Sequence, residues 1–243
     1  VTEGAEIKVP LIAKGTGTTL WAPGLELGHQ PNTDLGNQWT SRMARKTITI
    51  TNKGPKAQTL VWFNQTAIES TQALKAAAEK KAEESGSKQR KVDETELKVD
   101  EVFRVEVNGS AEPVTVEAGA TAVLSIVGMC KKPGRVVERL FCRSKMEKET
   151  RVVIELEVAA SFCDPTCEFS SPSLDFVYMY DPGNPAMEIQ QDKTVRITNT
   201  APLALQCNVR TGGAPFLVEP QDVDLPPGGS ADLTVSFDAA FRG

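Results

Sequence analysis

Residue types that support catalysis are scarce in this sequence. His29 is the single histidine, so any Ser-His-Asp or Cys-His arrangement would have to use it. It lies in the turn-like stretch Leu27–Pro31, which contains no cysteine. We therefore interpret His29 as a surface or capping residue, and the sequence predicts no catalytic residue.

The five cysteines do not have the spacing of a metal site or of a disulfide framework. Three residues separate Cys163 from Cys167, unlike the Cys-x-x-Cys spacing of a zinc knuckle. Cys130, Cys142 and Cys207 are far from this pair in the sequence. An odd, sparse set favours free, mostly buried thiols in a reducing compartment. A local Cys163–Cys167 disulfide is the alternative, and we expect no bound metal or cofactor.

Composition narrows the classes of partner. The formal net charge is -5, which gives no electrostatic reason to bind nucleic acid or an anionic membrane. No apolar run reaches the roughly 18 residues that a membrane-spanning helix needs. A content of 40% hydrophobic and 24% charged residues is typical of a globular protein, and 243 residues are enough for two domains.

Three blocks of sequence occur twice, in the same order. Self-similarity of this kind indicates one supersecondary unit used twice, and such arrays commonly build surfaces and spacers. The matching pairs are Leu20–Leu27 with Phe169–Phe176, Ile48–Pro55 with Val195–Pro202, and Ala118–Ile126 with Pro227–Val235.

Most of the chain has the pattern of β-strands. Polar and apolar residues alternate in 46–51, 102–107, 122–127 and 152–158, as in half-buried strands. Many short strands separated by Asn, Gly and Pro turns predict a sandwich of antiparallel sheets, so the predicted fold class is all-β.

One segment of the first copy has a helical pattern instead. Thr66 and Glu69 fit a capping box, which predicts a helix over Ala67–Ser85 that ends before Gly86. Asn52 and Gly119 are 67 positions apart, whereas the matching Asn199 and Gly228 are 29 apart, so the first copy carries 38 extra residues. We expect a helical insertion over about residues 66–98.

The insertion has two interpretations. It is either a solvated excursion or a helix that docks a partner, because a helix inserted into a β-domain loop projects from the scaffold. A basic cluster near the first repeated strand is a second candidate surface. The candidate partner-binding residues are Ile68, Leu74, Lys80 and Lys81 of the insertion, and Arg42, Arg45 and Lys46 of the basic cluster.

The repeats also predict domain boundaries. Ile7–Ala13 is similar to Ile154–Ala160, which precedes the second copy. We expect residues 1–15 to be the closing strand of a preceding repeat, 16–163 to be one complete domain, and 164–243 to be a second domain that lacks its last strand. We expect Ile7–Ala13 to pair with a β edge of its own first domain or of a neighbouring copy, which would produce strand-exchange self-association.

These blocks together resemble the hydin family, whose members are long ciliary proteins built from tandem, immunoglobulin-like ASH domains. The resemblance covers almost the whole chain. The residues that carry it are Ile50–Trp62, Glu138–Cys142, Phe162–Phe176, Leu225–Ser230 and Val235–Phe241. It implies tandem immunoglobulin-like β-sandwiches related to the major sperm protein, the first of which carries the helical insertion.

The resemblance also implies a function. It indicates a non-enzymatic structural scaffold of the central-pair apparatus, located in the cytoplasm and cytoskeleton at the axoneme of motile cilia or flagella. The implied partners are other central-pair proteins and microtubule-associated proteins. The alternative is a module of the major-sperm-protein type that binds short acidic peptides. It would need several basic side chains on one sheet face, for which the candidates are Arg42, Arg45, Lys46 and Lys56. An enzyme of unknown type is a third hypothesis, and a deep pocket holding His29 with a carboxylate would favour it.

Overall fold

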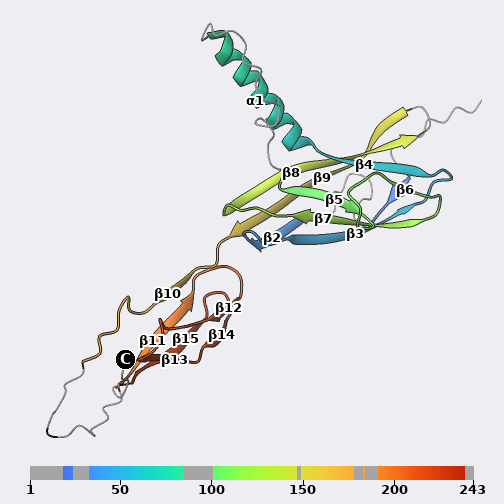
Figure 1. Cartoon of the computed structure of the whole chain (residues 1–243). Coiled ribbons are helices and arrows are strands. Elements are labelled where there is room, and N and C mark those ends of the chain that lie inside the picture. Colours follow the sequence, from blue (N-terminus) through green and yellow to red (C-terminus); the bar gives the residue numbers. More distant parts are fainter. Residues whose placement is uncertain are drawn as a thin grey trace, which may run out of the picture. The chain divides into compact units, whose positions relative to one another are not determined.

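The computed structural model describes residues 19–23, 33–84, 101–146, 149–177, 183 and 191–238. In this part of the chain the structure is all-β apart from one helix, as the sequence predicts (Figure 1). The predicted strand Ile7–Ala13, His29 and the end of the predicted insertion after Glu84 lie outside the described residues.

Two sheets hold the strands of residues 20–163. One sheet has the order β1-β3-β7-β5 and the other has the order β2-β9-β8-β4-β6. The bounds are β1 Leu20–Trp21, β2 Asp34–Trp39, β3 Ala44–Asn52, β4 Gln58–Asn64, α1 Gln65–Glu84, β5 Phe103–Val107, β6 Val114–Val116, β7 Thr121–Gly128, β8 Gly134–Met146 and β9 Glu149–Cys163.

Alternating apolar residues build the core of this sandwich. On β7, Ala122, Leu124 and Ile126 are each at most 1% exposed, because a strand directs every second side chain to the same face. The facing sheet contributes Leu140 of β8 and Leu156 of β9, which are also buried. The long strands β8 and β9 therefore cover the inner face of the first sheet.

The strands of residues 167–237 form two further sheets. A four-stranded sheet has the order β10-β11-β15-β13, and β12 pairs with β14. The bounds are β10 Cys167–Phe169, β11 Gln191–Asn199, β12 Leu205–Asn208, β13 Phe216–Glu219, β14 Asp222–Leu225 and β15 Ser230–Phe237. The core of this part comprises Val195, Ile197, Ala201, Leu205, Val218, Leu225 and Leu233.

The turn after β3 is built around the buried side chain of Asn52. Its amide donates to the backbone oxygens of Lys56, Val116 and Glu117, at 2.8, 3.1 and 3.2 Å. Its Oδ1 accepts from the Gly54 N–H at 3.0 Å. The residue is 0% exposed, so one buried side chain satisfies four backbone groups of the turn.

Asn199 builds the same turn after β11. It donates to the backbone oxygens of Leu203, Leu225 and Pro226, at 2.9, 3.0 and 3.1 Å, and accepts from the Ala201 N–H at 2.9 Å. Gly119 and Gly228, the later landmarks of the repeat, both have positive φ and donate their N–H to the oxygens of Asn52 and Asn199. Both copies thus have the same kind of turn. In the first copy the insertion lies between Asn52 and Gly119, the two residues whose contact closes the turn.

The compact units of the chain do not follow the repeat boundaries in a simple way. One unit comprises Val1–Thr33, Lys46–Ile126 and Glu138–Glu157, and the other comprises Asp34–Arg45, Val127–Val137 and Val158–Gly243. The predicted boundaries after residues 15 and 163 therefore stay predictions. Within the described residues, no helix combines the length and the apolar character that a membrane crossing requires.

Candidate functional site

Helix α1 begins directly at the end of β4, and Asn64 is its N-cap. The Asn64 Oδ1 accepts a hydrogen bond from the Ala67 N–H at 3.0 Å, which satisfies one of the free donors of the first turn. Ala67 is 5% exposed, so the first turn packs onto the sandwich. Figure 1 shows the rest of α1 extending away from the strands.

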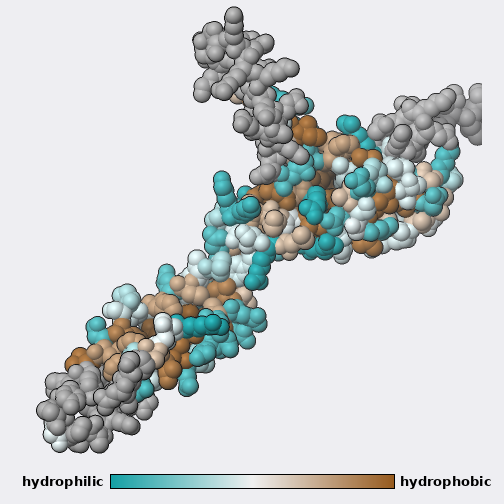
Figure 2. All heavy atoms as spheres, viewed as in Figure 1, coloured by the Kyte–Doolittle hydropathy of each residue, from teal (hydrophilic) through white to brown (hydrophobic). Residues whose placement is uncertain are grey.

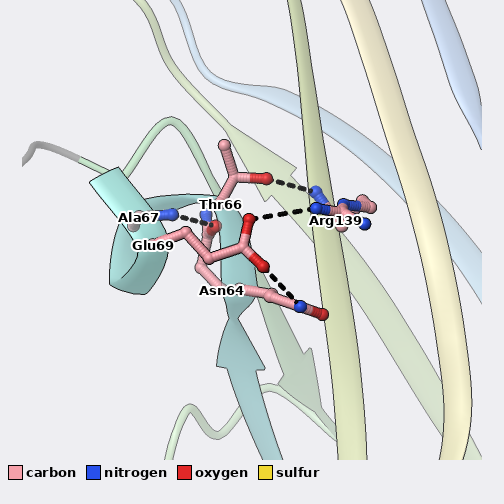
Figure 3. A network of polar contacts seen from close by, with 6 residues as sticks. Asn64, Thr66, Ala67, Glu69 and Arg139 are labelled. Carbon is pink, nitrogen blue, oxygen red and sulfur yellow. Dashed lines mark hydrogen bonds and ion pairs between the residues drawn. The ribbon is translucent and has the colours of Figure 1, made fainter. Parts of the chain in front are cut away.

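The prediction that Thr66 is the N-cap is wrong. Thr66 lies inside the first turn, where its Oγ1 accepts from the Arg139 N–H of β8 at 2.9 Å. Glu69, the other half of the predicted capping box, forms an ion pair with Arg139 at 3.0 Å (Figure 3). The helix begins two residues earlier than predicted because the Asn at the end of the strand caps it, which leaves Thr66 and Glu69 to contact β8.

Glu138 joins the two ends of the inserted segment. It is 6% exposed and accepts from the Asn64 amide at 2.7 Å, before the insertion. It also accepts from the Val102 and Phe103 N–H groups at 3.2 and 2.8 Å, after the insertion. The Asn64 amide in turn donates to the Phe103 oxygen at 3.1 Å. A buried carboxylate therefore fixes the base of α1 to the sheet.

The sequence analysis did not identify Glu138 as a functional residue. A signal was present, because Glu138 occupies a core-facing position of β8 together with the buried Leu140 and Cys142. A charged residue at such a position is rarely buried without hydrogen-bonding partners, which predicts that it serves a defined network.

The candidate residues on α1 are at the surface but do not form one stripe. Ile68 and Leu74 are 40% and 46% exposed, and Lys80 is exposed. Ile68 and Leu74 lie about 120° apart around the helix axis, since consecutive residues of an α-helix advance by about 100°. Lys81 belongs to α1, and its side chain is outside the described set. A partner that contacts both apolar residues would have to reach two sides of the helix.

The candidate basic cluster does not converge. Arg42 lies in the turn before β3, and Arg45 and Lys46 are consecutive residues of β3. Successive side chains of a strand point to opposite faces. Arg45 is exposed, whereas Lys46 is on the same face as the buried Ala44 and Ile50. The single-face basic groove that an acidic-peptide module needs is therefore not formed by these three residues.

All five cysteines are free thiols, and Cys163 and Cys167 are not bonded to each other. The Sγ of Cys167 lies 3.9 Å from the Sγ of Cys207 on β12. Cys142 is 0% exposed, and its burial raises the pKa of the thiol to about 12. In the part of the chain that the structure describes, no three His, Cys, Asp or Glu residues are grouped as metal ligands.

Among the comparisons with known proteins, a family model matches the C-terminal part of the chain. Residues 172–243 match the family model described as HYDIN/CFA65/VesB-like, Ig-like domain. The search of curated proteins finds no match.

Several solved structures are similar to this chain at low sequence identity. The ASH/PapD-like domain of human CEP192 is 11% identical, with 67% of this chain and 98% of that chain covered and a TM-score of 0.38. WR4, a C. elegans MSP family member, is 11% identical, covering 60% and 99% with a TM-score of 0.30. The E. coli chaperone DraB is 10% identical, covering 93% and 98% with a TM-score of 0.31. At these scores the likenesses carry no argument about function.

The fold prediction is confirmed. The chain is all-β and consists of immunoglobulin-like β-sandwich units, with one helical insertion in the first. Its C-terminal unit is similar to HYDIN/CFA65/VesB-like domains over residues 172–243.

Proposed function

We propose that this chain is a non-enzymatic scaffold segment of the axoneme in motile cilia or flagella, at the central-pair apparatus. The match of residues 172–243 to the HYDIN/CFA65/VesB-like domain model carries the proposal. The repeated Asn52 and Asn199 turns support it, because they indicate an array of one structural unit. In such an array, rigid sandwiches set the distance between attached proteins.

Helix α1 is the docking element in this proposal. Its first turn is fixed by Asn64, Glu138 and Arg139, whereas Ile68 and Leu74 remain exposed. A rigid base with exposed apolar side chains presents a helix to a partner at a low cost in conformational entropy. The proposed partners are other central-pair proteins, or microtubule-associated proteins that lie beside them.

Localisation of the full-length protein tests the first part of the proposal. An endogenous fluorescent tag in a multiciliated cell should give a signal along the axoneme that overlaps a central-pair marker. A signal confined to the basal bodies or the cell body would contradict the proposal.

The docking role needs a separate test. The double variant Ile68→Glu/Leu74→Glu should lose proximity labelling of axonemal neighbours while keeping its localisation within the array. Met129→Glu is the matched control, because Met129 is also 46% exposed and lies outside the helix. Equal labelling by the double variant and the control would exclude α1 as the docking element.

A further inference from the structure

The first short strand of each copy pairs with the strand that ends in the buried Asn. Leu20 of β1 lies opposite Asn52, and Cys167 of β10 lies opposite Asn199. In both copies the backbone oxygen of the preceding residue accepts from the N–H that follows the Asn, at 2.9 and 3.0 Å. Leu20 and Cys167 therefore occupy equivalent positions in the fold, whereas the sequence repeat alone matches Leu20 with Phe169.

A second pair of equivalent positions lies on β4 and β12. In both copies the Asn amide donates to the backbone oxygen four residues further on, so the two chains correspond residue by residue after the Asn. β4 and β12 also pair alike, because the residue six after the Asn faces the residue whose oxygen accepts from the Asn amide. Leu60 of β4 and Cys207 of β12 each lie eight residues after their Asn, so they are equivalent.

Buried leucines occupy both positions in the first copy. Leu20 and Leu60 are 5% and 1% exposed, and β1 and β4 belong to different sheets. The Gln58 amide of β4 donates to the hydroxyl of Thr19, next to β1, which brings these two strands together across the sandwich. The second copy has a cysteine at each of the two positions.

The two cysteines of the second copy meet between its sheets. The Sγ atoms of Cys167 and Cys207 are 3.9 Å apart, and both side chains pack against the apolar core of this copy. Both are only half-buried, unlike the two leucines, so a small solute reaches them more easily. In the view of Figure 2, hydrophobic residues of this part of the chain reach the surface beside hydrophilic ones.

We propose that Cys167 and Cys207 are a reversible oxidation site, at which hydrogen peroxide converts the two thiols into a disulfide that joins the two sheets of the second copy. One sulfur attacks as thiolate, which breaks the peroxide O–O bond and gives a sulfenic acid and hydroxide; the hydroxide takes up the proton that the thiol lost. The other thiol then attacks the sulfenic sulfur, the S–S bond forms, and the sulfenic oxygen leaves as water with the second thiol proton. In total the thiols lose two electrons and two protons, and one peroxide becomes two waters.

Geometry and burial set how readily the pair reacts. An S–S bond is about 2.05 Å long, so rotation of the side chains must bring the Sγ atoms closer than their present 3.9 Å. Burial raises the pKa of the Cys167 thiol, and the adjacent Cys207 thiol raises it further. Cys167 is therefore mostly neutral at neutral pH, and oxidation should become faster as the pH rises, because the thiolate is the reactive form. Without oxidant both residues are free thiols.

Mass spectrometry of the full chain tests the site directly. The reduced protein is treated with hydrogen peroxide, the remaining thiols are alkylated, and disulfide-linked peptides are identified after digestion. We expect a Cys167–Cys207 link as the main product, which is absent before treatment and is reversed by dithiothreitol. A main product that links Cys163 to Cys167, links between separate chains, or the absence of any link would overturn the proposal.

Thermal unfolding tests whether the link joins the folded sheets. The disulfide connects residues 40 positions apart and restricts the unfolded chain, so the oxidised parent should melt about 5 °C or more above the reduced parent. Cys207→Ala should abolish this shift. Cys163→Ala is the matched control and should keep it, because Cys163 is also half-buried and lies close to Cys167 in the sequence.

Equal melting temperatures of the oxidised and reduced parent, or loss of the shift in the control, would overturn the proposal. The comparison of the two parent forms decides the question even if Cys207→Ala does not fold. The oxidation site does not depend on the scaffold proposal, since neither measurement involves the axoneme, so the two proposals fail separately.

Discussion

The side chain of Asn64 donates to Glu138 Oε2 at 2.7 Å, and this contact connects the start of the insertion to the sheet beneath it. Glu138 also accepts from the Phe103 N–H, where the chain returns from the insertion. The two ends of a long excursion are therefore held by one buried carboxylate. Consequently the two chain segments that flank the insertion are held together at the base of α1, independently of the rest of the insertion.

Replacing Glu138 should destabilise the protein more than any surface glutamate. Glu138→Ala leaves the Asn64 amide and two backbone N–H groups without their acceptor, and we expect a loss of about 3 kcal/mol in the free energy of unfolding. Glu138→Gln keeps one acceptor oxygen and should cost about 1 kcal/mol. Urea unfolding measures both, with the exposed Glu155→Ala as control. A loss of unfolding free energy equal to that of the control would show that the Glu138 carboxylate does not contribute to stability.

The insertion itself should be dispensable for folding. A deletion of Ile68–Val92, bridged by a short Gly linker, keeps Asn64, Ala67 and Glu138, and a shorter loop costs little entropy to close. It removes the exposed Glu69–Arg139 ion pair, which contributes about 1 kcal/mol or less. We expect the melting temperature to stay within about 4 °C of the parent in a thermal scan. Loss of the cooperative transition would place the insertion in the core.

Sequence reasoning succeeds where a pattern is local or repeated. The strands follow from the alternation of polar and apolar residues, and the Asn turns and the site of insertion follow from the repeated sequence around Asn52 and Asn199. It fails at the helix start, where Thr66 and Asn64 are both good N-caps and the end of β4 decides between them. The role of Glu138 depends on partners about 35 and 74 residues away, and one sequence alone does not reveal such contacts.

The two buried asparagines should have equal and large effects. Asn52→Ala and Asn199→Ala each remove three hydrogen bonds to backbone carbonyls and one from a backbone N–H, and we expect each to cost about 3 kcal/mol. Amide hydrogen exchange should show faster exchange around the altered turn in each variant. The exposed Asn37→Ala serves as control. A much smaller effect at one site would mean that the two turns are not equivalent.

The five cysteines should all react as free thiols in the native protein. Alkylation without reductant, followed by mass spectrometry, should modify five residues once the chain is unfolded. In the folded protein Cys142 should react last, because it is 0% exposed and its raised pKa disfavours the thiolate. A protected Cys163–Cys167 pair would contradict this prediction.

Burial of Cys142 should also make the stability of the protein fall at alkaline pH. Burial raises the pKa of the thiol from 9.0 to about 12, so the folded state favours the neutral form. The corresponding stabilisation is complete below about pH 9 and is lost as the pH rises toward 12, with a slope of up to about 1.4 kcal/mol per pH unit. Urea unfolding of the parent and of Cys142→Ala between about pH 8 and 10.5 isolates the effect of this group, since the other titrating groups are common to both. Cys142→Ala should be less stable at pH 8, because it leaves a small cavity, and the difference should narrow as the pH rises. A difference that stays constant across this range would show that the thiol ionises in the folded state as readily as in the unfolded one.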